Sequence, residues 1–176
     1  IDQWLFAPTW TRDDGRAATA HLHESWLVLA PDGPVGDAVA RRVVAAGAAA
    51  ILVAPGSSFQ RHGASRFSVR PDAGEDLAAV VRDLRDAGAT IAGAIHLWST
   101  TSGHDTPGNG AELALSYHSL IGLAAALEPS PEAPVPVIVA TTGAESVLDE
   151  QVQVPGHAMV RGPVLSLPSE VPGLRM

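Results

Sequence analysis

The residues best placed to do chemistry form a turn between a predicted strand and a predicted helix. The turn spans residues 32–36, reads DGPVG, and follows the apolar run 26–30. Glycines in such a turn let backbone N–H groups reach a pyrophosphate at a helix N-terminus. This turn has two glycines where the G-x-G-x-x-G fingerprint has three, and Pro34 lacks an amide donor. The pattern therefore predicts a dinucleotide-binding fold with a turn poorly suited to a dinucleotide.

The next predicted strand, Ala48 to Gly56, strengthens this interpretation. In dinucleotide-binding domains this strand ends in an acid for the ribose hydroxyls, or is followed by an arginine for the 2′-phosphate of NADP. No acid follows here. Arg61 lies some distance beyond the strand, in a polar loop, where solvation is the simpler explanation. We expect no cofactor to be bound by this segment.

Whole classes of catalysis are excluded by residue types that the chain lacks. All eleven basic residues are arginine, and there is neither lysine nor cysteine. This excludes Schiff-base chemistry, P-loops, thiolate nucleophiles, disulfides and zinc ribbons. The Tyr/Lys pair of short-chain reductases is excluded as well, because four residues after Tyr117, the only tyrosine, stands Ile121.

The remaining candidates are isolated in the sequence. His96 lies in an apolar strand, where a hydrogen-bonded core histidine is the expected role. His21 and His23 have no third metal ligand nearby, so we assign no metal. Ser57 and Ser58 follow a strand but do not complete a G-x-S-x-G elbow. We therefore predict no catalytic residue.

One loop is better placed than these residues to hold a ligand. The polar loop from Ser99 to Gly110 follows the strand that ends in HLW. Parallel α/β sheets bind ligands at the carboxyl ends of their strands. Any site in this chain is expected there.

Composition limits the possible partners and compartments. The chain has 176 residues, a net charge of −8 and 46% hydrophobic residues, which is typical of one globular domain. The acidic balance disfavours nucleic acid and anionic membrane surfaces. No basic leader and no apolar run of roughly 18 to 20 residues is evident, so we expect a cytoplasmic protein.

Apolar periodicity predicts a truncated Rossmann-like α/β fold. It has a parallel sheet of about five strands, helices on both faces, and an added N-terminal aromatic edge strand. Residues 1–24 form the arm and linker, and residues 25–176 form the subdomain. The predicted strands after the first two are 66–70, 89–98 and 135–141, and the predicted helices are 35–46, 74–88, 111–128 and one from Pro155 that Gly162 and Pro163 interrupt.

Taken in order, several runs resemble one known family over nearly the whole chain. They are WLFAPTW, SWLVLAPDGPVGDAVARRVVAAG, IAGAIHLWS, SLIGLAAALE, PVIVATTGAESV and VPGHAMVRGPVLSLPSEVPGLR. In order and spacing they resemble the N-terminal structural, noncatalytic subdomain of ketoreductases in modular type I polyketide synthases.

The resemblance implies a scaffold role. In that family a structural half without NADPH precedes a catalytic half that carries the glycine-rich loop and the Ser/Tyr/Lys set. The catalytic half uses NADPH to reduce a β-ketoacyl group on an acyl carrier protein. The expected partner of this chain is that half of the same synthase. The residues that the resemblance implies at the junction are Trp4, Leu5, Phe6 and Trp10 in the arm, and Leu174 and Met176 at the end.

Two alternatives remain open from the sequence. One is a pseudo-ketoreductase that braces a neighbouring methyltransferase domain, since some synthases of the family insert a methyltransferase between the halves. The other is a stand-alone Rossmann or flavodoxin-like domain that binds a ligand at the loop Ser99 to Gly110.

Overall fold

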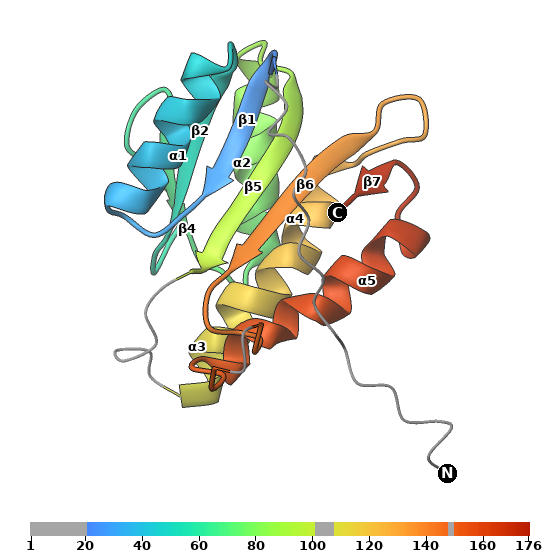
Figure 1. Cartoon of the computed structure of the whole chain (residues 1–176). Helices are drawn as coiled ribbons and strands as arrows, with labels where there is room; N and C mark the ends of the chain where they lie inside the picture. The colour runs from blue at the N-terminus through green and yellow to red at the C-terminus, as the bar shows by residue number, and fades with distance from the viewer. Residues whose placement is uncertain (1–20, 101–107, 148–149) are drawn as a thin grey trace.

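In the computed structural model, residues 21–100, 108–147 and 150–176 are described. They form one seven-stranded β-sheet with helices packed on both of its faces (Figure 1). The strand order is β3-β4-β2-β1-β5-β6-β7. All neighbouring strands are parallel except β3 and β4, which are antiparallel. The strands are β1 (Ser25–Leu29), β2 (Ala49–Pro55), β3 (Gln60–Arg61), β4 (Arg66–Val69), β5 (Ile91–Ser99), β6 (Val135–Thr141) and β7 (Leu174–Arg175).

The predicted parallel strands are confirmed, and two two-residue strands are added at the edges. β1 lies at the centre, with its residues wholly buried, as expected of a continuous apolar run between two layers. The predicted aromatic edge strand lies outside the described residues.

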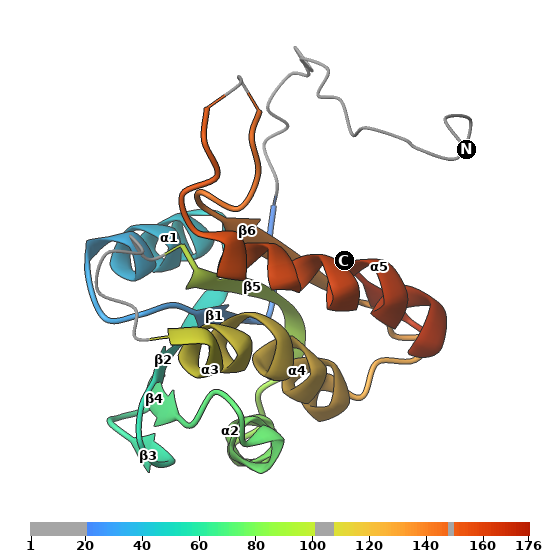
Figure 2. The ribbon, with the colours of Figure 1, turned by 90° about the horizontal axis from the view of Figure 1, so that it is seen from below.

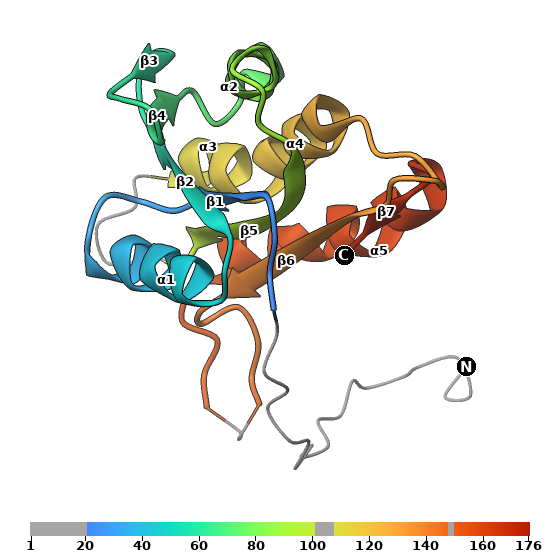
Figure 3. The ribbon, with the colours of Figure 1, turned by 90° about the horizontal axis from the view of Figure 1, so that it is seen from above.

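Helices cover the two faces unequally. They are α1 (Pro34–Ala45), α2 (Gly74–Asp86), α3 (Gly108–Leu113), the π-helical segment η2 (Ala114–His118), α4 (Ser119–Leu127), the 3₁₀ helix η3 (Pro155–Val160) and α5 (Arg161–Glu170). Only α1 lies on one face, whereas α2, α4 and α5 lie on the other (Figures 2 and 3). The larger cluster of buried apolar residues accordingly joins the sheet to α2, α4 and α5.

The smaller cluster lies under α1. Trp26, Val28 and Val43 are among its buried members. The indole of Trp26 lies across Gly93 of β5, where a Cβ would come within 2.6 Å of the ring. A residue without a side chain at Gly93 is thus what allows a large aromatic ring to pack between β1 and β5 on this face.

Two helix predictions need correction. The predicted helix 111–128 exists, but η2 interrupts it with a π-helical segment. The interruption predicted at Gly162 and Pro163 is wrong, because α5 runs through both residues. Pro163 stands in the first turn of α5, where proline is tolerated in a helix.

The long helix also corrects an expectation about apolar runs. Among the described residues, Gly110–Leu127 is long and apolar enough to cross a membrane by length and composition alone, with a mean hydropathy of 1.2 and 44% of its residues buried. It packs against α2 and the sheet through Leu120 and Leu123, both fully buried. A core helix passes the same test.

Helices α2 and α4 approach each other closely at a pair of glycines. A Cβ on Gly122 would lie 3.0 Å from the Cα of Gly74, and so against backbone that cannot rotate away. Gly110, in the same long helix, has open space around it.

We expect the same substitution to have opposite effects at Gly122 and at Gly110. Gly122→Ala is expected to destabilise the fold by about 1–3 kcal/mol, because it overpacks the α2–α4 contact. Gly110→Ala should stabilise it by about 0.5–1 kcal/mol, because alanine loses less backbone entropy in a helix. Urea unfolding of both variants measures the difference, and equal effects would contradict the close helix contact.

Candidate functional site: the carboxyl edge of the sheet

The turn between β1 and α1 retains part of a dinucleotide-binding geometry. Pro31, Gly33 and Gly36 occupy the three glycine positions of G-x-G-x-x-G. Gly36 fills the third role, since a Cβ there would lie 2.8 Å from the Cβ of Ala30 and 3.3 Å from the carbonyl oxygen of Pro31. Gly33 has φ of 142°, which disfavours any other residue, and open space around it. Two of the three roles are therefore present.

What the turn lacks is positive potential and a full set of donors. Pro34 is the first residue of α1 and has no N–H. Asp32 and Asp37 stand on either side of it, where a pyrophosphate would have to approach. Two carboxylates at a helix N-terminus use its favourable dipole themselves and repel a second anion.

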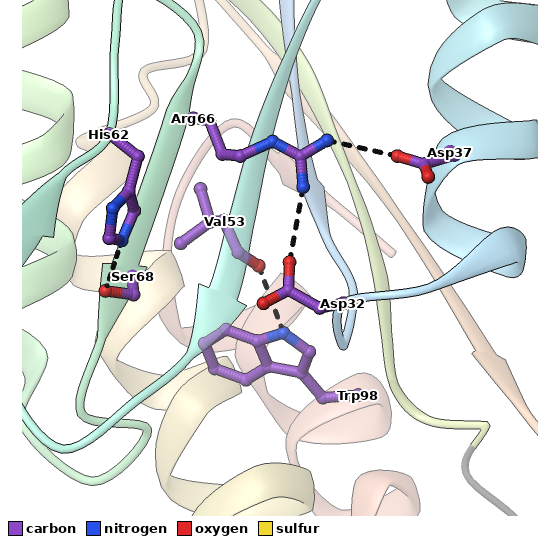
Figure 4. A network of polar contacts seen from close by, with 7 residues as sticks. All are labelled: Asp32, Asp37, Val53, His62, Arg66, Ser68 and Trp98. Atoms are coloured by element: carbon purple, nitrogen blue, oxygen red, sulfur yellow. Dashed lines mark hydrogen bonds and ion pairs between the residues drawn. The ribbon is translucent and has the colours of Figure 1, made fainter.

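Arg66 of β4 forms an ion pair with each of these carboxylates (Figure 4). It donates from Nη1 to Asp32 Oδ1 at 3.2 Å and from Nη2 to Asp37 Oδ1 at 3.1 Å. Its side chain crosses β2 to reach them, so it ties β4 to the turn and to α1. Exposed ion pairs such as these contribute at most about 1 kcal/mol each to stability. The ion pairs matter instead for ligand binding. They hold the Arg66 guanidinium on Asp32 and Asp37, so it is not free to bind a phosphate at this edge.

Arg61, the residue considered for a 2′-phosphate, lies elsewhere. It pairs with Asp83 of α2 at 3.0 Å and lies over the ring of Phe67, 5.8 Å from the centroid. It therefore faces the layer opposite α1. The arginine that reaches the β1–α1 turn is instead Arg66, which sequence analysis did not single out because it lies in a strand and reaches the turn only across the sheet.

The carboxyl end of β4 is closed by a second arginine. The carboxylate of Asp76, which is 4% exposed, accepts hydrogen bonds from the backbone N–H, Nε and Nη2 of Arg70 at 2.7–3.0 Å. The Arg70 hydrogen bonds lower the pKa of Asp76 against the opposing effect of burial. This pair joins the end of β4 to the first turn of α2 and leaves neither group free for a ligand.

Near this edge, the buried indole of Trp98 joins two strands of the sheet. Trp98 of β5 donates from Nε1 to the carbonyl oxygen of Val53 at 3.2 Å, on the face covered by α2 and α4 (Figure 4). The same carbonyl accepts the N–H of Ala30. The bond fastens β5 to β2 beneath the end of β1.

His96 is a buried, hydrogen-bonded core residue, as the sequence predicted. Its Nε2 lies 2.9 Å from Ser119 Oγ, which itself donates to the carbonyl oxygen of Leu115, so Nε2 carries the proton. Among the described residues Nδ1 has no partner. Burial lowers the pKa of His96 to about 3. The imidazole is neutral at ordinary pH and is fully buried.

A buried pair of serines lies beside His96. Ser99 Oγ and Ser116 Oγ are 3.0 Å apart, and both residues are fully buried. Ser116 belongs to η2, and Ser119 begins α4 directly after it. The π-helical segment thus brings Ser116 and Ser119 against the end of β5. The sequence analysis missed this cluster; its signal was the spacing of serines in SYHS within an otherwise apolar helix.

The other sequence candidates stand apart. Tyr117 and His118 lie exposed on the helix with their rings 5.6 Å apart, as predicted. No group of three metal-ligating residues occurs in the described part of the chain, and His21 and His23 are exposed. Ser58 only accepts a hydrogen bond from Gln60. Most of the loop proposed as a ligand site, residues 101–107, lies outside the described residues.

The predicted interface residues divide in the same way. Trp4, Leu5, Phe6 and Trp10 lie outside the described residues. Leu174 is buried in this chain's own core, and Met176 packs partly buried against the same cluster. Within the described chain β7 is the outermost strand, pairing only with β6. The interface role of these residues stays a prediction.

Comparison with known proteins identifies the family. The model of the family described as beta-ketoacyl synthase-like, N-terminal, matches residues 25–169. This chain belongs to that family. No curated protein sequence matches the chain.

Solved structures confirm the fold. A structure titled as the adenylation, ketoreductase and pseudo Asub domains of a keto acid-selecting NRPS module aligns over 96% of this chain with a TM-score of 0.80 and 20% identity. An N-terminal ketoreductase from the macrolactin assembly line aligns over 67%, with a TM-score of 0.55 and 22% identity. The Bacillus cereus enoyl-acyl carrier protein reductase aligns over 89%, with a TM-score of 0.60 and 17% identity.

The first two of these proteins are far longer than this family member. It spans 14% and 25% of their chains, against 71% of the Bacillus cereus reductase. The predicted resemblance to a ketoreductase subdomain is thus confirmed in family and fold. What the chain shares with all three structures is a Rossmann-like fold.

His96 predicts an acid-dependent loss of stability. Its pKa is about 3 in the folded chain and about 6.5 in an unfolded chain. The unfolded state therefore binds more protons between these values, and stability falls as the pH drops from 6.5 towards 3, by up to about 1.4 kcal/mol per pH unit. Urea unfolding at several pH values measures the slope.

His96→Gln keeps a donor for Ser119 and should remove most of that slope. His62→Gln is the matched control, because His62 is an exposed histidine and its replacement should leave the slope unchanged. A slope that persists in His96→Gln would contradict the assignment.

Proposed function

We propose that this chain is the noncatalytic structural subdomain of a polyketide synthase ketoreductase. It stabilises and orients the adjacent catalytic half, which uses NADPH to reduce a β-ketoacyl intermediate held on an acyl carrier protein. The observation that carries the proposal is the β1–α1 turn, where the glycine geometry survives but Asp32, Asp37 and Arg66 form their own ion pairs. A Rossmann-like sheet whose turn lacks free donors for a cofactor phosphate is what we expect of a noncatalytic half.

Three further features support a scaffold. His96 and the nearby serines are buried in hydrogen bonds with one another and with backbone. The family model covers most of the chain. The keto acid-selecting NRPS module described above contains a ketoreductase and a domain named pseudo Asub. The proposal includes a cytoplasmic location, and a methyltransferase domain as a further neighbour in the same synthase.

Cofactor binding tests the proposal directly. Titration of the isolated chain with NADPH, followed by energy transfer from its four tryptophans and by calorimetry, should show no saturable binding. A longer chain that includes the following reductase half should bind, because its own glycine-rich loop supplies the donors. Saturable micromolar binding by the isolated chain would overturn the scaffold proposal and return the turn at Gly33 to consideration.

The aromatic arm tests the proposed partner. Trp4→Ala combined with Trp10→Ala should reduce assembly with a separately expressed reductase half, measured by co-purification and by the size of the complex. Leu165→Ala is the control, because Leu165 is 74% exposed on α5, outside the proposed junction. Unchanged assembly of the double variant would count against a role of the arm at the junction.

A further inference from the structure

The outer surface of α4 and α5 is apolar, whereas that of their neighbour α2 is charged. In the long helix formed by α3, η2 and α4, Leu113, Tyr117 and Ile121 are all exposed and follow one another at intervals of four residues. Leu165 of α5 is 74% exposed. Every exposed residue of α2, by contrast, is charged. Large apolar side chains gathered on one helical surface are typical of a protein interaction site.

The long helix and α5 lie side by side (Figure 2), and their apolar side chains meet at one level. A Cβ on Gly162 of α5 would lie 3.6 Å from the ring of Tyr117, so these residues are neighbours. Each helix connects parallel strands, and both therefore run in the same direction. At about 1.5 Å per residue, Leu165 and Ile121 lie about 4.5 and about 6 Å beyond this contact. They form the centre of one surface.

Charged residues lie at the two ends of this surface. The exposed residues of α5 between Arg161 and Glu170 are all uncharged. Arg161 marks the end where α5 begins, and the exposed acids Glu170 and Glu128 mark the end where the two helices stop. Glu112, at the first end, is half-buried against Gly156 of η3. The exposed charges of the surface are thus basic at one end and acidic at the other.

The surface is large enough for a specific dimer. The long helix, residues 108–127, spans about 30 Å, and α5 packs beside it at about 10 Å. A face of about 30 Å by about 20 Å offers roughly 600 Å² on each copy. Two copies would bury roughly 1,200 Å², which reaches the lower end of the range for stable interfaces.

We propose that this surface joins two copies of the chain across a two-fold axis, with Ile121 and Leu165 at the centre of the contact. A two-fold axis perpendicular to the helices makes them antiparallel between the copies, and the four helices pack as a bundle. Arg161 then faces the acidic end of the partner subunit, and opposite charges meet at both ends. The same patch serves both copies, as a two-fold interface requires.

This dimer does not depend on the proposed function, because it involves only the chain itself. It uses none of the residues predicted at the junction with a reductase half. That junction is tested by assembly of two different chains, whereas the dimer is tested by self-association of one.

Sedimentation equilibrium of the full chain tests the dimer. The mass should rise with concentration from that of one chain to that of two and no further, because two-fold packing is closed. Ile121→Asp and Leu165→Asp should each raise the dissociation constant at least about tenfold, since each buries a carboxylate in the contact. Val44→Asp is the matched control. It adds the same charge at an exposed valine of α1, on the opposite face of the sheet, and should leave the dissociation constant unchanged.

Unfolding midpoints of the three variants, measured in the same samples, show that each remains folded. A chain that stays monomeric at every concentration would overturn the proposal. An effect of Val44→Asp as large as that of the other two substitutions would overturn it as well, because self-association would then depend on net charge alone.

Charge reversal tests the antiparallel orientation. Glu170→Arg should weaken the dimer about three- to tenfold at low salt, because it sets an arginine opposite the basic end of the partner subunit. Asp86→Arg is the matched control, since it changes the net charge equally at an exposed acid of α2 and should not weaken the dimer. Equal dissociation constants for these two variants would overturn the two-fold packing.

Discussion

A parallel sheet depends on cover for both of its faces, and this requirement governs the architecture of the chain. β1 and β5 are apolar on both sides, so each needs two packed layers to keep its side chains from water. On one face α2, α4 and α5 supply a full layer, with glycines allowing α2 and α4 to approach closely. On the other face α1 covers only the first half of the sheet. The exposure of Ile138 on β6 is the direct result.

The carboxyl edge combines part of a dinucleotide-binding geometry with charges that pair within the chain. Gly36 is needed for the close contact between α1 and β1 whether or not a cofactor binds, so packing alone accounts for it. The charges are a different matter. Asp32, Asp37 and Arg66 satisfy one another, and the nearby Arg70 and Asp76 do the same. All five of these charged groups are thus engaged by other parts of the described fold.

The same principle applies below the edge. His96, Ser99, Ser116 and Ser119 resemble components of a catalytic site by residue type, yet they are buried and hydrogen-bonded. Burial disfavours the charged imidazolium and keeps solvent and substrates away. Their role is to fix the helix after β5 in one register. This cluster therefore contributes packing and hydrogen bonds to the core, as the proposed structural role expects.

Local patterns in the sequence were enough to predict β1, β2, β5 and β6, the helices α1 and α2, and the deficiencies of the β1–α1 turn. Apolar runs, glycine caps and proline positions act over a few residues, so they can be interpreted without the fold. Long-range pairing was decided only by the tertiary structure. Arg66 meets Asp32 and Asp37 because strand order places β4 and β1 on either side of β2. Likewise, Ser116 meets Ser99 only because the helix after β5 packs back against that strand. Ile138 is exposed because α1 covers β1 and β2 but not β6.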